Sequence, residues 1–94
     1  MIQPLNPIQI QQYLKQFNSE WQVINGKKIK REFSFKDFKD AMVFVNKVAD
    51  LAEAERHHPD INIFYNRVVI ELWTHDIGGL SKKDFDLAAK IEVY

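Results

Sequence analysis

Apolar residues at helical spacing mark the start of the chain, and a hairpin pattern follows them. Asn6-Pro7 is typical of a helix start, with a capping residue before a proline in the first turn. The apolar positions of this helix are Ile10, Tyr13, Leu14 and Phe17. A short strand is predicted over 21–24, and Asn25-Gly26 is a strong signal for a hairpin turn. The pattern therefore predicts an amphipathic helix that leads into a two-stranded unit.

The second strand of this hairpin alternates between an apolar and a polar face. Its apolar positions are Ile29, Phe33 and Phe35, and its polar positions are Lys28, Lys30 and Glu32. Arg31 interrupts the apolar face. Alternation of this kind predicts a strand with one buried side.

The longest predicted helix runs roughly from Lys36 to Arg56. Its apolar stripe consists of Phe38, Ala41, Met42, Val45, Val48, Ala49 and Ala52. Phe44 and Leu51 lie beside this stripe, about 100° round the helix. Two interpretations are open at this point. These side chains face a second subunit, or the helix presents one wide apolar face to a sheet.

Two further strands are predicted, from Ile61 to Tyr65 and from Val68 to Thr74, with a tight turn at Asn66-Arg67. On the second strand, one face consists of Val68, Ile70 and Leu72, and the other of Val69, Glu71, Trp73 and His75. Gly78-Gly79 ends the strand. Ser81 to Asp84 then has the pattern of a capping box, which predicts a final helix.

The predicted order is helix, two strands, helix, two strands, helix. Hairpins followed by helices imply a four-stranded antiparallel sheet with the helices packed on one face, an α+β fold of two layers. The length of 94 residues fits a single domain over 1–94.

Composition narrows the classes of function. The 13 basic and 13 acidic side chains cancel, so binding driven by nucleic-acid phosphates is not expected. The absence of cysteine excludes disulfides and thiolate metal sites. No apolar run approaches the ~20 residues of a membrane span, and the amino terminus lacks a leader pattern. We therefore expect a cytoplasmic protein that does not bind membranes.

The three histidines all lie near the ends of predicted elements. His57 and His58 follow the long helix, and His75 follows the fourth strand. Functional groups gather at such positions, and histidine exchanges protons near neutral pH. The pattern alone supports a histidine site and three incidental surface histidines about equally.

A zinc site is the first alternative. Histidines with carboxylates such as Glu53 and Asp76 supply suitable ligand types. However, His57 and His58 are adjacent and lack the i, i+4 spacing that places two ligands on one helical face. We therefore expect no metal. Nucleophilic catalysis is disfavoured because there is no Gly-x-Ser-x-Gly motif, and Gly78-Gly79 lacks the pattern of a phosphate-binding loop.

Two carboxylates have two interpretations each. Asp84 either completes the capping box with Ser81 or orients a nearby imidazole, since a carboxylate on an apolar stripe needs a partner. Glu53 either pairs with Arg56 in solvent or hydrogen-bonds His57 or a ligand.

The two tryptophans are similarly ambiguous. Core packing is the ordinary role for tryptophan in a small domain. A ring near a pocket could instead stack on a planar heterocycle. Both interpretations apply to Trp21 and to Trp73, which shares a predicted face with His75.

The segment 53–59, together with Tyr65, His75 and Asp84, resembles the signature of the pterin-4a-carbinolamine dehydratases. The similarity extends to Trp21 and to the segments 33–38, 74–76 and 78–81, so that only about the first dozen residues are uninformative. A His-His-Pro triplet followed at fitting intervals by a tyrosine, a third histidine and an aspartate is a specific match.

The resemblance implies dehydration of 4a-hydroxytetrahydrobiopterin to quinonoid dihydropterin, with the pterin as substrate and no cofactor. It implies that the catalytic residues are His57, His58 and His75. The further substrate-binding residues would be Arg56, Trp73, Thr74, Asp76 and Trp21, and the supporting residues would be Glu53, Pro59 and Asp84.

The resemblance also bears on partners. A homodimer or homotetramer is expected, and a functional link to an aromatic amino acid hydroxylase through pterin recycling. Two alternatives remain open. Animal relatives serve as dimerisation cofactors of a homeodomain transcription factor, which suggests a protein-binding module. A role in molybdopterin-cofactor metabolism has been proposed for other relatives.

Overall fold

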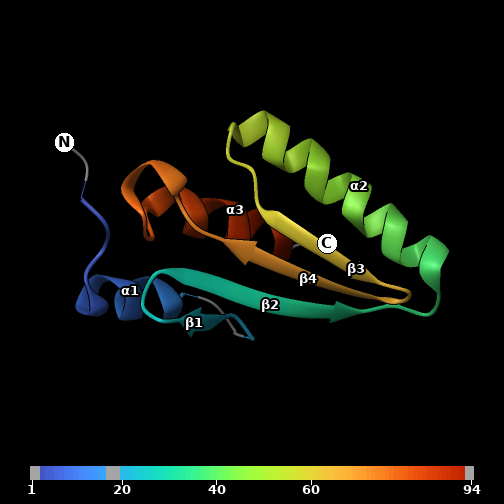
Figure 1. The fold of residues 1–94 in the computed structure, drawn as a ribbon, viewed down its shortest axis with the longest axis horizontal. Helices are drawn as coiled ribbons and strands as arrows, with labels where there is room; N and C mark the ends of the chain where they lie inside the picture. Colours follow the sequence, from blue (N-terminus) through green and yellow to red (C-terminus); the bar gives the residue numbers. More distant parts are fainter. Residues whose placement is uncertain (1–2, 17–19, 93–94) are drawn as a thin grey trace.

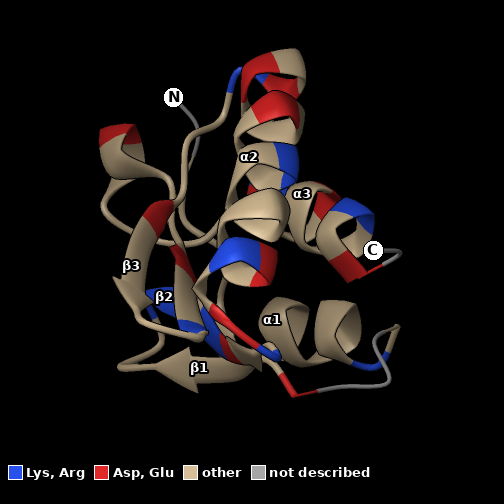
Figure 2. Ribbon diagram, turned by 90° about the vertical axis from the view of Figure 1, so that its right-hand side faces the viewer, with Lys and Arg blue, Asp and Glu red and all other residues tan. Residues whose placement is uncertain are grey.

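Helices and strands follow one another in the predicted order (Figure 1). The computed structural model describes residues 3–16 and 20–92. Its elements are α1 (Pro7–Leu14), β1 (Gln22–Ile24), β2 (Lys28–Ser34), α2 (Phe38–Glu55), β3 (Asp60–Phe64), β4 (Arg67–Leu72), the 3₁₀ turn η1 (His75–Ile77) and α3 (Lys82–Glu92). Figure 2 shows the sheet and the helices as separate layers, so the predicted α+β fold with helices on one face is confirmed.

The sheet is antiparallel throughout, with the strand order β1-β2-β4-β3. The central strand β4 pairs with β2 through Ile70 opposite Arg31, and with β3 through Ile70 opposite Ile61. Val68, Ile70 and Leu72 are fully buried, as the alternation along this strand predicts. Burial of this face against the helices fixes the register, because a slip by one residue would expose all three side chains.

Both hairpin turns contain residues in the left-handed region. Asn25 and Gly26 have φ of 54° and 68°, which confirms the turn predicted there. The second turn lies at Tyr65-Asn66, one residue earlier than predicted, because Phe64 pairs with Arg67. Asn66 is held there by two hydrogen bonds: Phe35 N donates to its carbonyl at 2.8 Å, and its Nδ2 donates to Phe35 O at 3.1 Å.

The buried face of α2 differs from the predicted stripe. Phe38 is 48% exposed, and Ala49 is also exposed. Phe44 is buried, with its ring centroid 4.6 Å from that of Phe33, and Leu51 packs against the core. Burial of Phe44 supports the interpretation that the helix presents one wide apolar face to the sheet, with Leu51 half-buried at its edge.

The start of α2 also lies later than predicted. Asp37 is the capping residue, and its carboxylate accepts a hydrogen bond from Asp40 N at 2.9 Å. A side-chain acceptor at this position satisfies one of the free amides of the first turn. Residues Lys36 and Asp37 consequently remain outside the helix.

The remaining helices complete the core. In α1 the predicted capping residue Asn6 is confirmed, and Ile10 is buried. The Tyr13 ring stacks on Phe85 of α3 with centroids 4.9 Å apart. Phe17, predicted on the same stripe, lies outside the described residues. Within the described ranges, no helix combines the length and apolar character that crossing a membrane requires.

Arg31 fits on the inner side of the sheet because it is paired. Its Nη1 donates to Glu92 Oε1 of α3 at 2.8 Å, and its guanidinium carbon lies 4.6 Å from the centroid of the Phe33 ring. A charge in a half-buried position needs such compensation. Arg31, which interrupts the apolar face, thus links β2 to α3.

Candidate active site

A pocket of about 210 Å³ opens where the ends of α2 and β4 meet the start of α3. Its walls consist of Arg56, His57, His58, Trp73, Thr74, His75, Asp76 and Lys83. The structure therefore brings together all three histidines, although His75 follows His57 by 18 positions in the sequence. Lys83 was not predicted at the site. The signal that could have found it is its position in the first turn of the helix that carries Asp84.

The end of α2 directs the first two histidines away from the helix. Arg56 adopts a left-handed conformation, with φ of 53° and ψ of 41°. His57 N donates to Ala52 O at 3.1 Å and Arg56 N donates to Glu53 O at 3.3 Å, the pair of bonds that defines a Schellman ending. Pro59 then restricts the backbone of His58 and prevents continuation of the helix.

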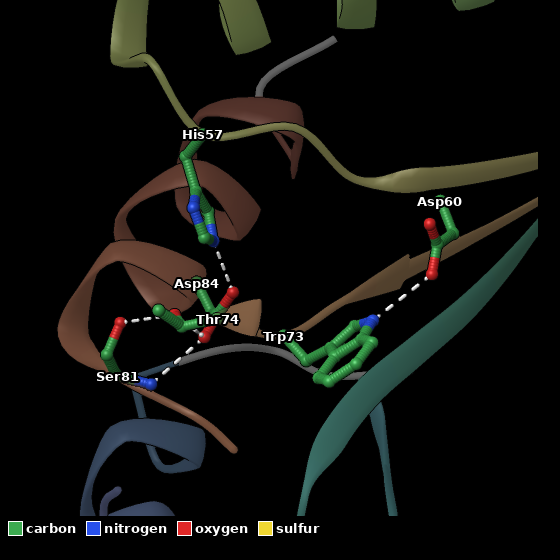
Figure 3. A network of polar contacts seen from close by, with 6 residues as sticks. All are labelled: His57, Asp60, Trp73, Thr74, Ser81 and Asp84. Carbon is green, nitrogen blue, oxygen red and sulfur yellow. Dashed lines mark hydrogen bonds and ion pairs between the residues drawn. The ribbon is translucent and has the colours of Figure 1, made fainter. Parts of the chain in front are cut away.

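His57 is held by a buried carboxylate. Its Nε2 lies 2.5 Å from Asp84 Oδ1 (Figure 3). The Asp84 side chain is fully buried, and that of His57 is 10% exposed. A carboxylate in such a place is costly unless donors surround it, so the hydrogen bonds around Asp84 decide whether the arrangement is stable.

Two more donors reach the second oxygen of Asp84. Ser81 N donates to Oδ2 at 2.9 Å, and Thr74 Oγ1 donates to the same oxygen at 2.8 Å. Because the Thr74 proton is used in this bond, Ser81 Oγ must donate in its 2.6 Å contact with Thr74 Oγ1. The network therefore ties the end of β4 to the start of α3.

Both predicted roles of Asp84 are present in one side chain. It accepts from Ser81 N, which is half of a capping box. The Ser81 hydroxyl is directed to Thr74 rather than to the helix amides. Asp84 also orients an imidazole, namely His57.

The same network defines the tautomer of His57. Asp84 is surrounded by donors and accepts from Nε2, so this nitrogen carries a proton. In the neutral ring the lone pair then lies on Nδ1. His57 thus has a fixed orientation in the pocket wall and one nitrogen that can take a proton.

His58 has a different environment. Its Nε2 lies 2.5 Å from Glu53 Oε2, but the side chains are 66% and 76% exposed. Glu53 was predicted to pair with Arg56, or with His57 or a ligand. The structure corrects this, because the Schellman ending turns His58 back over the last turn of α2, where Glu53 projects.

His75 begins η1 and packs on Trp73. The two ring centroids are 4.0 Å apart with an angle of 36° between the rings. Trp73 Nε1 donates to Asp60 Oδ2 at 3.1 Å (Figure 3). The predicted strand was too long here: β4 ends at Leu72, so His75 lies in the 3₁₀ turn.

A charged pair flanks Trp73 on β2 and β4. Lys28 Nζ lies 2.8 Å from Glu71 Oε1 and 5.9 Å from the Trp73 ring centroid. The hydrogen bond and charge of Glu71 raise the pKa of Lys28 above its ordinary value, and burial opposes the shift. Lys28 therefore stays protonated beside the indole at neutral pH.

Trp21 does not belong to the pocket. It is 5% exposed and part of the hydrophobic core, and its ring makes an edge contact with Phe33 at 6.2 Å between centroids. Its predicted role in substrate binding is wrong in this structure. The ordinary core role applies, because the residue precedes β1, at the opposite edge of the sheet from β3.

Across residues 3–16 and 20–92, no three His, Asp or Glu side chains form a group that could hold a metal ion. The pocket provides a buried imidazole and an exposed one, a third imidazole packed on an indole, and further hydrogen-bonding groups. Such a site can transfer protons to and from a planar ligand.

Known proteins are similar to this chain in sequence. The model of the family described as pterin 4 alpha carbinolamine dehydratase matches residues 3–94. A protein of Picosynechococcus sp. is 51% identical over 94% of each chain, and one of Alkaliphilus metalliredigens is 46% identical over 95% of this chain and 80% of its own. Both are described as candidate pterin-4-alpha-carbinolamine dehydratases.

Two solved structures have the same fold. A Brucella melitensis protein described as a transcriptional coactivator/pterin dehydratase has a TM-score of 0.88 and 34% identity, with 96% of both chains covered. A pterin dehydratase-like protein, described as a RuBisCO assembly factor in the α-carboxysome, has a TM-score of 0.68 and 20% identity, covering 81% of this chain and 89% of its own. The second likeness concerns the fold alone. Taken with the histidine pocket, these matches show that the chain belongs to the pterin-4a-carbinolamine dehydratase family.

Proposed function

We propose that this protein dehydrates 4a-hydroxytetrahydropterins, with 4a-hydroxytetrahydrobiopterin as the expected substrate, to quinonoid dihydropterin and water. The observation that carries the proposal is the His57–Asp84 pair, which holds an imidazole in one tautomer in the wall of a pocket shared with two more histidines. Membership of the family supports the substrate class.

The reaction needs two proton transfers and no change in oxidation state. An acid protonates the hydroxyl on C4a, the C4a–O bond breaks, and water leaves. A base takes the proton from N5, whose electrons form the new C4a=N5 bond. The enzyme gives one proton and takes one proton in each turnover. The acid and the base then return to their starting protonation states by exchanging protons with solvent. Each positioned group of this kind contributes about 10²–10⁴-fold.

His57 and His75 are the proposed acid–base pair. Nδ1 of His57 is the basic nitrogen, and the Asp84 carboxylate stabilises the positive charge that the ring acquires. His75, packed at an angle on Trp73, is the proposed acid. His58 binds and polarises the substrate from the exposed side of the pocket.

The other wall residues bind the ring. Trp73 offers an indole face, held by Asp60, for a planar heterocycle. Arg56, Thr74 and Asp76 supply polar groups around it. The pterin is the substrate, and the proposed chemistry uses no further cofactor.

The test is the rate of dehydration of enzymatically generated 4a-hydroxytetrahydropterin. Wild type and a His57→Ala, His75→Ala double variant are compared in the presence of a chelator. We expect chelator-resistant acceleration by wild type that is lost in the double variant. Acceleration that disappears with chelator would replace this mechanism by a metal-dependent one. No acceleration by folded wild type would contradict the proposed function.

Pterin recycling for an aromatic amino acid hydroxylase is the proposed context, and a homodimer or homotetramer the proposed assembly. The supporting feature is exposed apolar surface on the hairpin of the edge strand β3, where Phe64 is 51% and Tyr65 68% exposed. Exposed edges of this kind favour pairing with a second copy. Light scattering coupled to size exclusion distinguishes these assemblies from a monomer.

A further inference from the structure

Two cationic side chains of the pocket wall have no part in the proton transfers proposed above. Arg56 extends from the end of α2 and Lys83 from the first turn of α3. In the part of the chain that the structure describes, neither side chain forms an ion pair. Asp76 is the acidic member of the wall. The two cations are thus available to a ligand.

Both cations occupy positions that helix stability alone would fill differently. Arg56 has a left-handed backbone, which glycine or asparagine adopts at lower cost, although a positive charge is favourable at this end of a helix. Lys83 lies in the first turn of α3, where the helix dipole favours acidic residues. Local conflicts of this kind are expected where a side chain serves function.

A second hollow adjoins the histidine pocket at Lys83, and Arg56 lines only the histidine pocket. The second hollow has a volume of about 290 Å³, shares Thr74, Asp76 and Lys83 with the histidine pocket, and continues past Ile77 to Lys82. Lys83 therefore stands at the junction of the two spaces. A ligand whose ring lies among the histidines can extend a substituent past this ammonium group.

We propose that the preferred substrate is a reduced pterin whose C6 side chain carries a phosphate monoester, bound by Arg56 and Lys83. The proposal rests on the pterin dehydratase function and specifies its substrate class. Phosphate suits the pair because it carries nearly two negative charges at neutral pH and offers three acceptor oxygens. Arginine binds two of these oxygens at once, and lysine adds a point charge.

Binding of two stable product-like pterins tests the preference without measuring turnover. The probes are 7,8-dihydroneopterin and its 3′-monophosphate, which differ only in the phosphate. Calorimetric titration at low salt should show the phosphorylated probe binding roughly tenfold more tightly, as expected for two partly exposed ion pairs. The preference should shrink as salt is added, and millimolar inorganic phosphate should compete with it.

Single-charge variants identify the residues responsible. Lys83→Gln and Arg56→Asn should each bring the affinity ratio closer to one. Lys36→Gln removes the same charge beyond the other end of α2 and should leave the ratio unchanged. Arg56→Asn should not lower the thermal unfolding midpoint, because asparagine suits the left-handed position. A lost preference in that variant therefore cannot reflect misfolding.

The outcomes separate this proposal from the general function. Equal affinity of wild type for the two probes would overturn the phosphate preference and leave pterin dehydration intact. A preference that survives both variants would overturn the assignment to Arg56 and Lys83. If neither probe binds, both this proposal and pterin binding by the histidine pocket fall.

Discussion

His57 and His58 are neighbours in the chain, and each presents Nε2 at 2.5 Å from a carboxylate oxygen. Their surroundings are nevertheless opposite. The side chains of His57 and Asp84 are 10% and 0% exposed, whereas those of His58 and Glu53 are 66% and 76% exposed. The contact distance therefore does not distinguish the two pairs, and the difference in their burial does.

Burial changes both energy and orientation. An exposed ion pair contributes about 0–1 kcal/mol, because water screens it and both side chains lose freedom. Removing one partner of a buried pair typically costs about 3–5 kcal/mol, because the other partner remains without compensation. Asp84 is also fixed by Thr74 and Ser81. We therefore expect His57 to be rigid and His58 to adjust to a ligand.

The largest effect on stability is expected for Asp84→Ala. The change leaves the donors of His57, Thr74 and Ser81 without their shared acceptor, and should lower the free energy of unfolding by about 3–5 kcal/mol. Urea denaturation measures this. Asp86→Ala, on the same helix and paired with exposed Lys82 at 3.4 Å, is the control and should cost less than about 1 kcal/mol. Similar losses in both variants would contradict the special status of Asp84.

Asp84→Asn separates orientation from stability. The amide retains the size of the carboxylate but cannot accept with both ends, so an amide N–H directed at His57 would move the ring proton to Nδ1. We expect kcat to fall roughly 10²-fold or more, with a smaller stability loss than in the alanine variant. A protein with this substitution and near-normal kcat would show that the tautomer of His57 is unimportant.

The sequence predicted which residues line the site better than it predicted the contacts between them. The resemblance to the family implied the histidines, Arg56 and the segment 73–76 as site residues, and the pocket contains all of them. The choice of Glu53 for His58 depends on the left-handed turn at Arg56, which no periodicity reveals. Lys83 adjoins Asp84 in the first turn of α3, but sequence spacing does not show that this turn faces the end of β4.

The fold shows the same division. Alternation along β4 predicted the burial of Val68, Ile70 and Leu72, because one buried face imposes a period of two, but Val69 on the other face is buried as well. Phe38 is exposed although it was predicted on the apolar stripe, and Phe44 beside the stripe is buried. Helical spacing does not give the width of an apolar face until the surface it packs on is known. The core position of Trp21 could not be predicted without the strand order β1-β2-β4-β3, in which β1 and β3 lie at opposite edges of the sheet.

A moderate effect is expected where Trp73 is held. Asp60→Ala removes the 3.1 Å hydrogen bond to Nε1, which contributes about 0.5–1.5 kcal/mol to orienting the indole. KM should rise roughly two- to tenfold at nearly constant kcat, as steady-state kinetics can show. Asp50→Ala, an exposed acidic site of α2, supplies the control. A drop in kcat at constant KM would instead place Asp60 in the proton transfers.

The smallest effect is expected for Glu53→Gln. The exposed pair with His58 should contribute less than about 0.5 kcal/mol to stability, so thermal unfolding in low and high salt should scarcely differ from wild type. A loss comparable with that of Asp84→Ala would mean that exposure does not weaken this pair, and the contrast between the two histidines would fail.

The kinetic parameters of His57→Gln and His58→Gln, measured side by side on 4a-hydroxytetrahydropterin, test the central claim most directly. If His57 is the oriented proton-transfer group, its replacement lowers kcat about 10²–10⁴-fold. The replacement of His58 should mainly raise KM and affect kcat far less. The reverse pattern, with kcat abolished by loss of His58 and nearly unaffected by loss of His57, would contradict the account.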